Sequence, residues 1–166
     1  MTLETHVASD EQLIRLLQIG IVLEEVVEAR ASRHYQSLSP EEQAELDREI
    51  VELLDEAVEE SAAHRSELEE LIERLEGETV PFEDIERLVE DRYGKTKPED
   101  FDGILYDQLH GEETAYKFYD DLIAAIEESS VTFSIDRAEL LETLRSIRAE
   151  EEEGAREVTE IMEGRT

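Results

Sequence analysis

Two stretches of this sequence place a glutamate among apolar residues at the spacing of one helix face. Between residues 104 and 126, apolar side chains recur three and four positions apart, and Glu112 falls within that stripe. The same pattern occurs 84 positions earlier (112 − 28), with matching residues Glu28, Ala31, Tyr35 and Leu38 against Glu112, Ala115, Tyr119 and Leu122. A charged glutamate in an apolar stripe costs several kcal/mol unless it is paired. The presence of two such carboxylates predicts a bound cation as their shared partner.

The two other long helical stretches carry further candidate ligands. In the stretch that follows Pro40, His64 belongs to the apolar face and Glu60 lies one turn before it. In the stretch that follows Asp136, the register places Glu151 in the stripe, although Glu150 and Glu152 remain open choices within the glutamate run. Carboxylates are hard anionic ligands that can bridge divalent ions, and imidazole supplies nitrogen. The predicted metal ligands are Glu28, Glu60, His64, Glu112 and Glu151.

This ligand set resembles that of the ferritin-like carboxylate bundles, and of the rubrerythrins most of all. In that family, each half of the bundle supplies a glutamate from one helix and a Glu-x-x-His pair from the next, and together they hold two metal ions. The resemblance implies iron or manganese as the cofactor and a non-haem protein that handles iron, dioxygen or peroxide. A di-iron oxidoreductase or peroxidase-like activity is left open. Tyr35 and Tyr119 also match the family's pattern and are weaker candidates for hydrogen-bonding a metal ligand.

The sequence departs from the family pattern at both histidine positions. Ser61, not a glutamate, lies three residues before His64, and Gly154 stands where the second histidine is expected. One metal position would then have nitrogen and carboxylate ligands, and the other only carboxylates and water. We expect one tightly held ion next to His64 and a second that is weak or absent.

A metal-free interpretation stands beside this one. The chain has 47 acidic residues among 166, so that some acids fall on any helix face by chance. The alternative is a degenerate helical bundle that has lost its metal chemistry and acts as an oligomeric interaction or structural module.

The elements that must position these residues are all helices. No strand-like alternation of useful length occurs, and four long helical patterns are predicted, at about residues 9–37, 40–75, 104–129 and 137–161. The short link at Ser39 and Pro40 makes the first two antiparallel. We expect an all-α, ferritin-like antiparallel four-helix bundle of two helical hairpins, joined by a long crossover at residues 78–101 that contains a short helix. Residues 1–166 should form a single domain.

The charge of the chain limits its partners. The formal net charge is −31, and the 16 basic residues include only three lysines. Duplex nucleic acid and anionic membranes are therefore excluded as expected partners. The acid-rich, lysine-poor composition resembles that of proteins from extreme halophiles, so we expect the fold to need high salt.

The absence of cysteine excludes disulfides and a rubredoxin-like iron centre, so redox turnover would need an external electron donor. Neither a basic and apolar leader nor an apolar run of about 18 residues occurs, which predicts a cytoplasmic protein. We also expect a homodimer, because the first helix has apolar residues outside its stripe. These are Leu16, Ile19, Val22, Leu23 and Val26.

Overall fold

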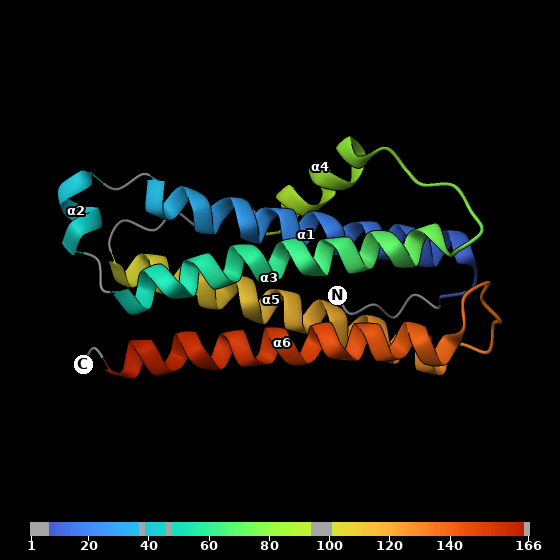
Figure 1. Ribbon diagram of the computed structural model, residues 1–166. Helices are drawn as coiled ribbons and strands as arrows, with labels where there is room; N and C mark the ends of the chain where they lie inside the picture. Colours follow the sequence, from blue (N-terminus) through green and yellow to red (C-terminus); the bar gives the residue numbers. More distant parts are fainter. Residues whose placement is uncertain (1–6, 37–38, 46–47, 94–100, 165–166) are drawn as a thin grey trace.

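The computed structural model (Figure 1) describes residues 7–36, 39–45, 48–93 and 101–164. Every regular element in these ranges is a helix, so the all-α class is confirmed. The helices are α1 (Asp10–Gln36), α2 (Pro40–Glu45), α3 (Arg48–Glu73), α4 (Phe82–Tyr93), α5 (Phe101–Glu128) and α6 (Arg137–Gly164).

The four long helices α1, α3, α5 and α6 run side by side (Figure 1). α1 packs mainly against α3, and α5 packs mainly against α6, each pair running in opposite directions. α5 begins at the same end of the molecule as α3, so these two helices point the same way. The segment between them includes α4, which lies along the outside of α1.

The start of α1 follows from its capping residues. The Ser9 hydroxyl accepts a hydrogen bond from the backbone N–H of Gln12 at 3.2 Å, and the Gln12 side-chain oxygen accepts one from the N–H of Ala8 at 2.7 Å. The arrangement resembles a capping box, except that the Gln12 side chain reaches the N–H of Ala8, one residue before Ser9. It satisfies backbone donors that the first turn of a helix leaves without partners.

The second predicted helix is divided in the structure. We expected one helix from Pro40 to about Leu75, but α2 (Pro40–Glu45) and α3, which begins at Arg48, do not share one axis (Figure 1), and residues 46 and 47 between them lie outside the described residues. The sequence of α2, PEEQAE, has a single apolar residue, Ala44, and that residue is exposed. α2 therefore has no apolar stripe with which to pack on the long helices.

The core consists of two apolar clusters, one toward each end of the long helices. The larger one includes Leu17, Leu68, Leu122 and Leu144, one from each long helix. The smaller one is formed by Ala31, Ile50, Leu53, Leu54, Ala57 and Val158. Each long helix passes from one cluster to the other through a short polar segment. These polar segments lie at the same level and form a layer between the two clusters.

Most of the apolar surface of α1 is covered within the chain. Ile85 and Val89 of α4 belong to the larger cluster, and Val22 and Leu23 are buried. The other three residues on which the dimer expectation rested are partly buried and pack against the same cluster; they are Leu16, Ile19 and Val26. Among the described residues, no helix is both long and apolar enough to cross a membrane.

Candidate metal centre

The polar layer between the two clusters contains buried ionisable side chains from all four long helices. α1 supplies Glu24, α3 supplies His64, α5 supplies Glu112 and α6 supplies Glu151, and all four are buried. Helix geometry explains the convergence, because each of these residues continues the apolar stripe of its own helix. Folding that buries the stripes therefore also brings the polar residues together.

His64 is the centre of this layer. Its Nδ1 atom lies 3.1 Å from Oε1 of Glu151 and 3.2 Å from Oε1 of Glu24. On the other side of the ring, Nε2 lies 3.0 Å from Oε2 of Glu150 and 4.0 Å from Oε1 of Glu60. The imidazole is completely buried, whereas the Glu150 side chain is 48% exposed. His64 thus connects the buried carboxylates to one at the surface.

The carboxylates around His64 hold it in its protonated form. Burial alone would lower the pKa of His64, but its hydrogen bonds to Glu151 and Glu24 and the charges of those residues outweigh burial and raise the pKa to about 11. An imidazolium can donate from both ring nitrogens. The ring therefore faces carboxylates on both sides as a donor in the metal-free protein.

Glu112 and Glu151 interact directly across the layer. Burial, followed by a hydrogen bond and repulsion from Glu151, raises the pKa of Glu112 to about 10, against the opposing hydrogen bond from Gln108. The Gln108 Nε2 atom donates to Oε1 of Glu112 at 3.2 Å. Burial and the charge of Glu24 raise the pKa of Glu151 to about 8. At neutral pH, protons neutralise part of the charge that these carboxylates would otherwise carry in the interior.

Three groups of side chains place ligand atoms close enough together to hold a cation. They are Glu24–His64–Glu151, Glu60–His64–Glu150 and Glu60–Glu112–Glu151, with the ligand atoms of each group within 4.8 Å of one another. The first and third groups share Glu151. A carboxylate shared in this way can bridge two metal ions, since each of its oxygens can bind one of them.

Three buried polar atoms in this region have no hydrogen-bond partner within the described part of the chain. They are Oε2 of Glu24, Oε2 of Glu112 and the hydroxyl of Tyr119. Leaving a buried carboxylate oxygen without a partner is costly. A cation between the carboxylates would satisfy Glu24 and Glu112, and carboxylate oxygens with one imidazole nitrogen suit iron or manganese. The residues present therefore fit such an ion.

Gly154 in α6 makes room for Glu112. A Cβ atom at Gly154 would lie 2.7 Å from Oε2 of Glu112 and 2.8 Å from its carboxyl carbon. The Glu112 carboxylate thus occupies the space next to α6 that a side chain at position 154 would need. Nitrogen is therefore supplied only by His64 among the described groups of ligand atoms.

The structure brings four of the five predicted ligands together and places the fifth elsewhere. Glu60, His64, Glu112 and Glu151 belong to the groups described above. Glu28 does not: its Oε2 accepts a hydrogen bond from Arg65 at 2.5 Å, and the side chain is 25% exposed.

Glu24, one turn earlier on α1, takes the place expected for Glu28 and is 1% exposed. Glu24 also lies in the apolar stripe of α1, so helical periodicity alone was compatible with Glu24 as the ligand from this helix. The repeated Glu–Ala–Tyr–Leu pattern favoured Glu28 instead. Tyr119 of that repeat is buried beside Phe118, with the rings edge to face, whereas the side chain of Tyr35 lies outside the described part of the chain.

The glutamate run at the middle of α6 divides between the layer and the surface. Glu151 is buried, as the register predicted, whereas Glu152 is exposed and belongs to none of the three groups. Glu150 is half exposed and still reaches His64. The sequence alone left these three open because the apolar stripe of a helix is itself about 100° wide, so that an error of one position in its register changes which glutamate points inward.

Comparison of the chain with protein-family models, with curated proteins and with solved structures found no match.

Proposed function

We propose that this chain is a ferritin-like, rubrerythrin-like bundle that binds iron or manganese at the polar layer and handles iron, dioxygen or peroxide. The observation that carries the proposal is the convergence of Glu24, His64, Glu112 and Glu151 from four different helices, with two buried carboxylate oxygens that lack partners. Polar groups buried in this way are typical of functional sites.

The residues near His64 define two unequal positions for an ion. His64, Glu24 and Glu151 would hold the first, with one nitrogen and carboxylate oxygens. Glu60, Glu112 and Glu151 would hold the second, with carboxylate oxygens only. When bound, the metal supplies one-electron redox chemistry and reactivity toward dioxygen or peroxide. An external electron donor would complete the cycle, since the chain has no cysteine-bound iron centre of its own.

The protein's own contribution is a site whose residues can change their protonation. Apolar clusters flank the layer on either side, and electrostatic interactions between its buried groups are stronger than they would be in water. His64 and Glu112 hold protons while no cation is present, and those protons must leave when carboxylates and imidazole bind a metal. Glu150, which contacts both His64 and solvent, lies where such protons can exit.

Metal analysis tests the proposal directly. Protein purified in molar salt without chelator, or loaded with ferrous or manganous ion under anaerobic conditions, should retain metal after gel filtration. Mass spectrometric metal analysis would give its amount per chain. Absence of any retained divalent ion after loading would contradict the proposed function.

One observation favours the metal-free alternative. Both ring nitrogens of His64 have carboxylate partners without a cation. Protons shared in hydrogen bonds can therefore offset much of the negative charge in the layer. In that case the chain would be a structural or interaction module. The homodimer belongs to both proposals, and light scattering in molar salt that shows only a 19 kDa species would count against it.

A further inference from the structure

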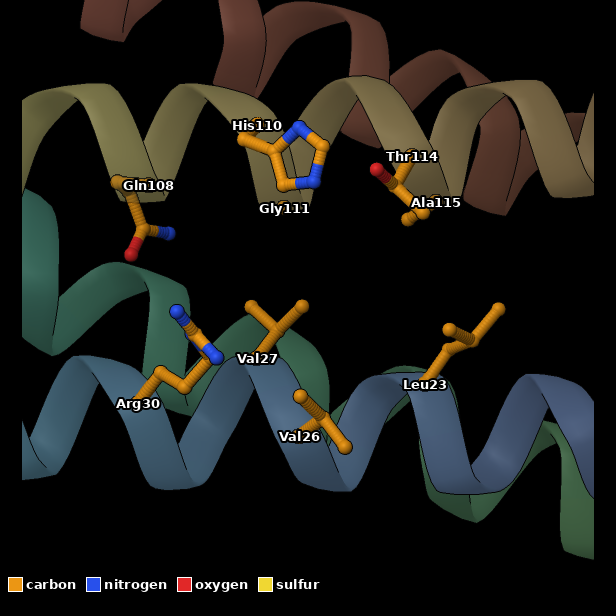
Figure 2. A pocket seen from close by; sticks show the side chains of 9 residues that line it. All are labelled: Leu23, Val26, Val27, Arg30, Gln108, His110, Gly111, Thr114 and Ala115. Atoms are coloured by element: carbon orange, nitrogen blue, oxygen red, sulfur yellow. The ribbon is translucent and has the colours of Figure 1, made fainter. Parts of the chain in front are cut away.

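A small cavity opens between α1 and α5 at the level of the polar layer (Figure 2). Its volume is about 30 Å³, roughly two to three times the 10–15 Å³ that one water molecule needs on the same measure, so that it has room for a molecule of only a few atoms. Figure 2 shows the side chains of Leu23 and Val27 pointing from α1 toward Gly111 and Ala115 of α5, and Val26 also lines the cavity. The inner part of the cavity is therefore apolar.

The residues that line the cavity are direct neighbours of the candidate ligands. Leu23 precedes Glu24, and Val27 follows it by three positions on α1. On α5, Gly111 precedes Glu112 and Ala115 follows it by three positions. The cavity thus lies beside the carboxylate layer on the side where α1 and α5 meet.

Gln108 links the cavity to the ligand set. Its buried side chain lines the cavity and points from α5 toward α1 (Figure 2), and its Nε2 atom donates to Oε1 of Glu112 at 3.2 Å. At the outer side, His110 is exposed and Arg30 is partly exposed. The cavity therefore has a polar rim and a mainly apolar interior, and the Gln108 amide connects it to Glu112.

The glycine at position 111 keeps this space open. A Cβ atom at Gly111 would lie 3.4 Å from Cγ2 of Val27, at ordinary van der Waals distance. An alanine fits there without moving the backbone but places a methyl group in the cavity. A mid-helix glycine costs about 1 kcal/mol relative to alanine, so that the cavity is kept at some expense of helix stability.

We propose that this cavity admits and holds dioxygen next to the carboxylate layer, an inference that rests on the proposed function. Small apolar cavities in proteins stay dry and bind small apolar molecules such as xenon. Dioxygen has the size and low polarity that the lining residues favour. Peroxide is polar, and the apolar interior offers it few hydrogen-bonding groups.

The test uses the metal-free chain in molar salt, with methyl groups labelled for NMR. Dioxygen is paramagnetic, so methyl groups that it contacts relax faster under oxygen pressure than under nitrogen. The methyl groups of Val27 and Ala115 should show a severalfold larger effect than those of Leu140 and Leu144, which are buried in the larger cluster away from the cavity. Equal effects at all four residues would overturn the proposal.

The Gly111→Ala variant supplies the second arm of the test. Filling the cavity should remove most of the oxygen effect at Val27, whereas Gly164→Ala, at a position with nothing within 4 Å, should leave it unchanged. An undiminished effect in Gly111→Ala would also overturn the proposal. Because both measurements are made without metal, they separate this proposal from the proposed function, which fails if no ion is retained on loading.

Discussion

The carboxylate of Glu112 lies directly against Gly154, so that a Cβ atom on that glycine would come 2.7 Å from Oε2. Contacts below 3.0 Å are essentially never made by a Cβ atom, so one group must move, and the flexible end of Glu112 moves more readily than a helix backbone. A side chain at position 154 would therefore displace the Glu112 carboxylate and leave the helix backbone in place.

This contact predicts the effect of Gly154→Ala. The variant should remain folded, because alanine is favoured over glycine within a helix by about 1 kcal/mol. Displacement of Glu112 should weaken manganese binding at the carboxylate-only position by about tenfold or more. Calorimetric titration with manganese in molar salt measures this loss. Gly164→Ala is the control, and equal binding by both variants would show that Glu112 is not a ligand.

A second prediction separates Glu24 from Glu28. Glu24→Gln should lower the affinity of the tighter metal position by about tenfold or more, because it removes an anionic ligand next to His64. Glu28→Gln should leave that affinity unchanged, because Glu28 pairs with Arg65 at a partly exposed site. Both are isosteric changes on one helix, so they control for each other. If Glu28→Gln gave the larger loss, the sequence repeat would identify the ligand better than the structure does.

The sequence was informative where burial and periodicity act together. The stripes of α1, α3, α5 and α6 predict helices and place His64, Glu112 and Glu151 on their inner faces, with Glu60 partly exposed one turn before His64. The ambiguity between Glu24 and Glu28 could not be resolved that way, because both lie in the same stripe one turn apart. Only the rotation of α1 against α3, which sets Glu28 beside Arg65, makes the choice.

Other features depend on the distance between helices, which a single sequence does not contain. The sequence pattern indicates a missing histidine at Gly154, whereas in the structure the absence of a side chain there leaves space for the Glu112 carboxylate. The division between α2 and α3 was also missed, because the acidic segment around Pro40 has good helix formers but no face to bury.

A third prediction concerns pH. Glu112 has a pKa of about 10 in the folded chain against 4.5 as its ordinary value, and His64 about 11 against 6.5. The folded state therefore holds more protons than the unfolded state between pH 4.5 and 11, so the free energy of unfolding must fall as pH rises. Each such proton changes it by about 1.4 kcal/mol per pH unit. The metal-free protein should be more stable at pH 5 than at pH 9.

Chemical unfolding in molar salt with chelator, followed by circular dichroism, measures this slope. Glu112→Gln should reduce the slope between about pH 4.5 and pH 10, because the amide cannot titrate. Glu113→Gln is the matched control, since Glu113 follows Glu112 on α5 and its side chain is exposed. A slope that Glu112→Gln leaves unchanged would mean that Glu112 is ionised in the folded protein.

A fourth prediction concerns salt. The chain carries a net charge of −31, and its few basic residues form exposed ion pairs such as Arg148–Asp120 and Arg145–Glu127, each at 2.8 Å. Exposed pairs of this kind contribute at most about 1 kcal/mol each. Removing salt should therefore lower the melting temperature and helicity through self-repulsion. Circular dichroism at low ionic strength checks this, and a fully helical, cooperatively melting protein there would contradict the halophilic interpretation.

The last prediction is that the two metal positions differ. His64, Glu24 and Glu151 offer an imidazole nitrogen, whereas Glu60, Glu112 and Glu151 offer only oxygens. Loss of one neutral ligand can cost about tenfold or more in affinity. The second ion must also bind near the positive charge of the first. We therefore expect one tightly held ion per chain beside His64 and a second that is weak or absent.

Anomalous diffraction at the iron or manganese edge measures the two occupancies directly. His64→Ala should remove the stronger position, because the ring is the only nitrogen ligand in the groups described here. Glu112→Gln should spare that position, because Glu112 belongs only to the all-carboxylate group. Two equally occupied ions would refute the asymmetry. Survival of the stronger ion in His64→Ala would mean that carboxylates alone hold it, and that the position of the histidine serves the fold instead of the metal.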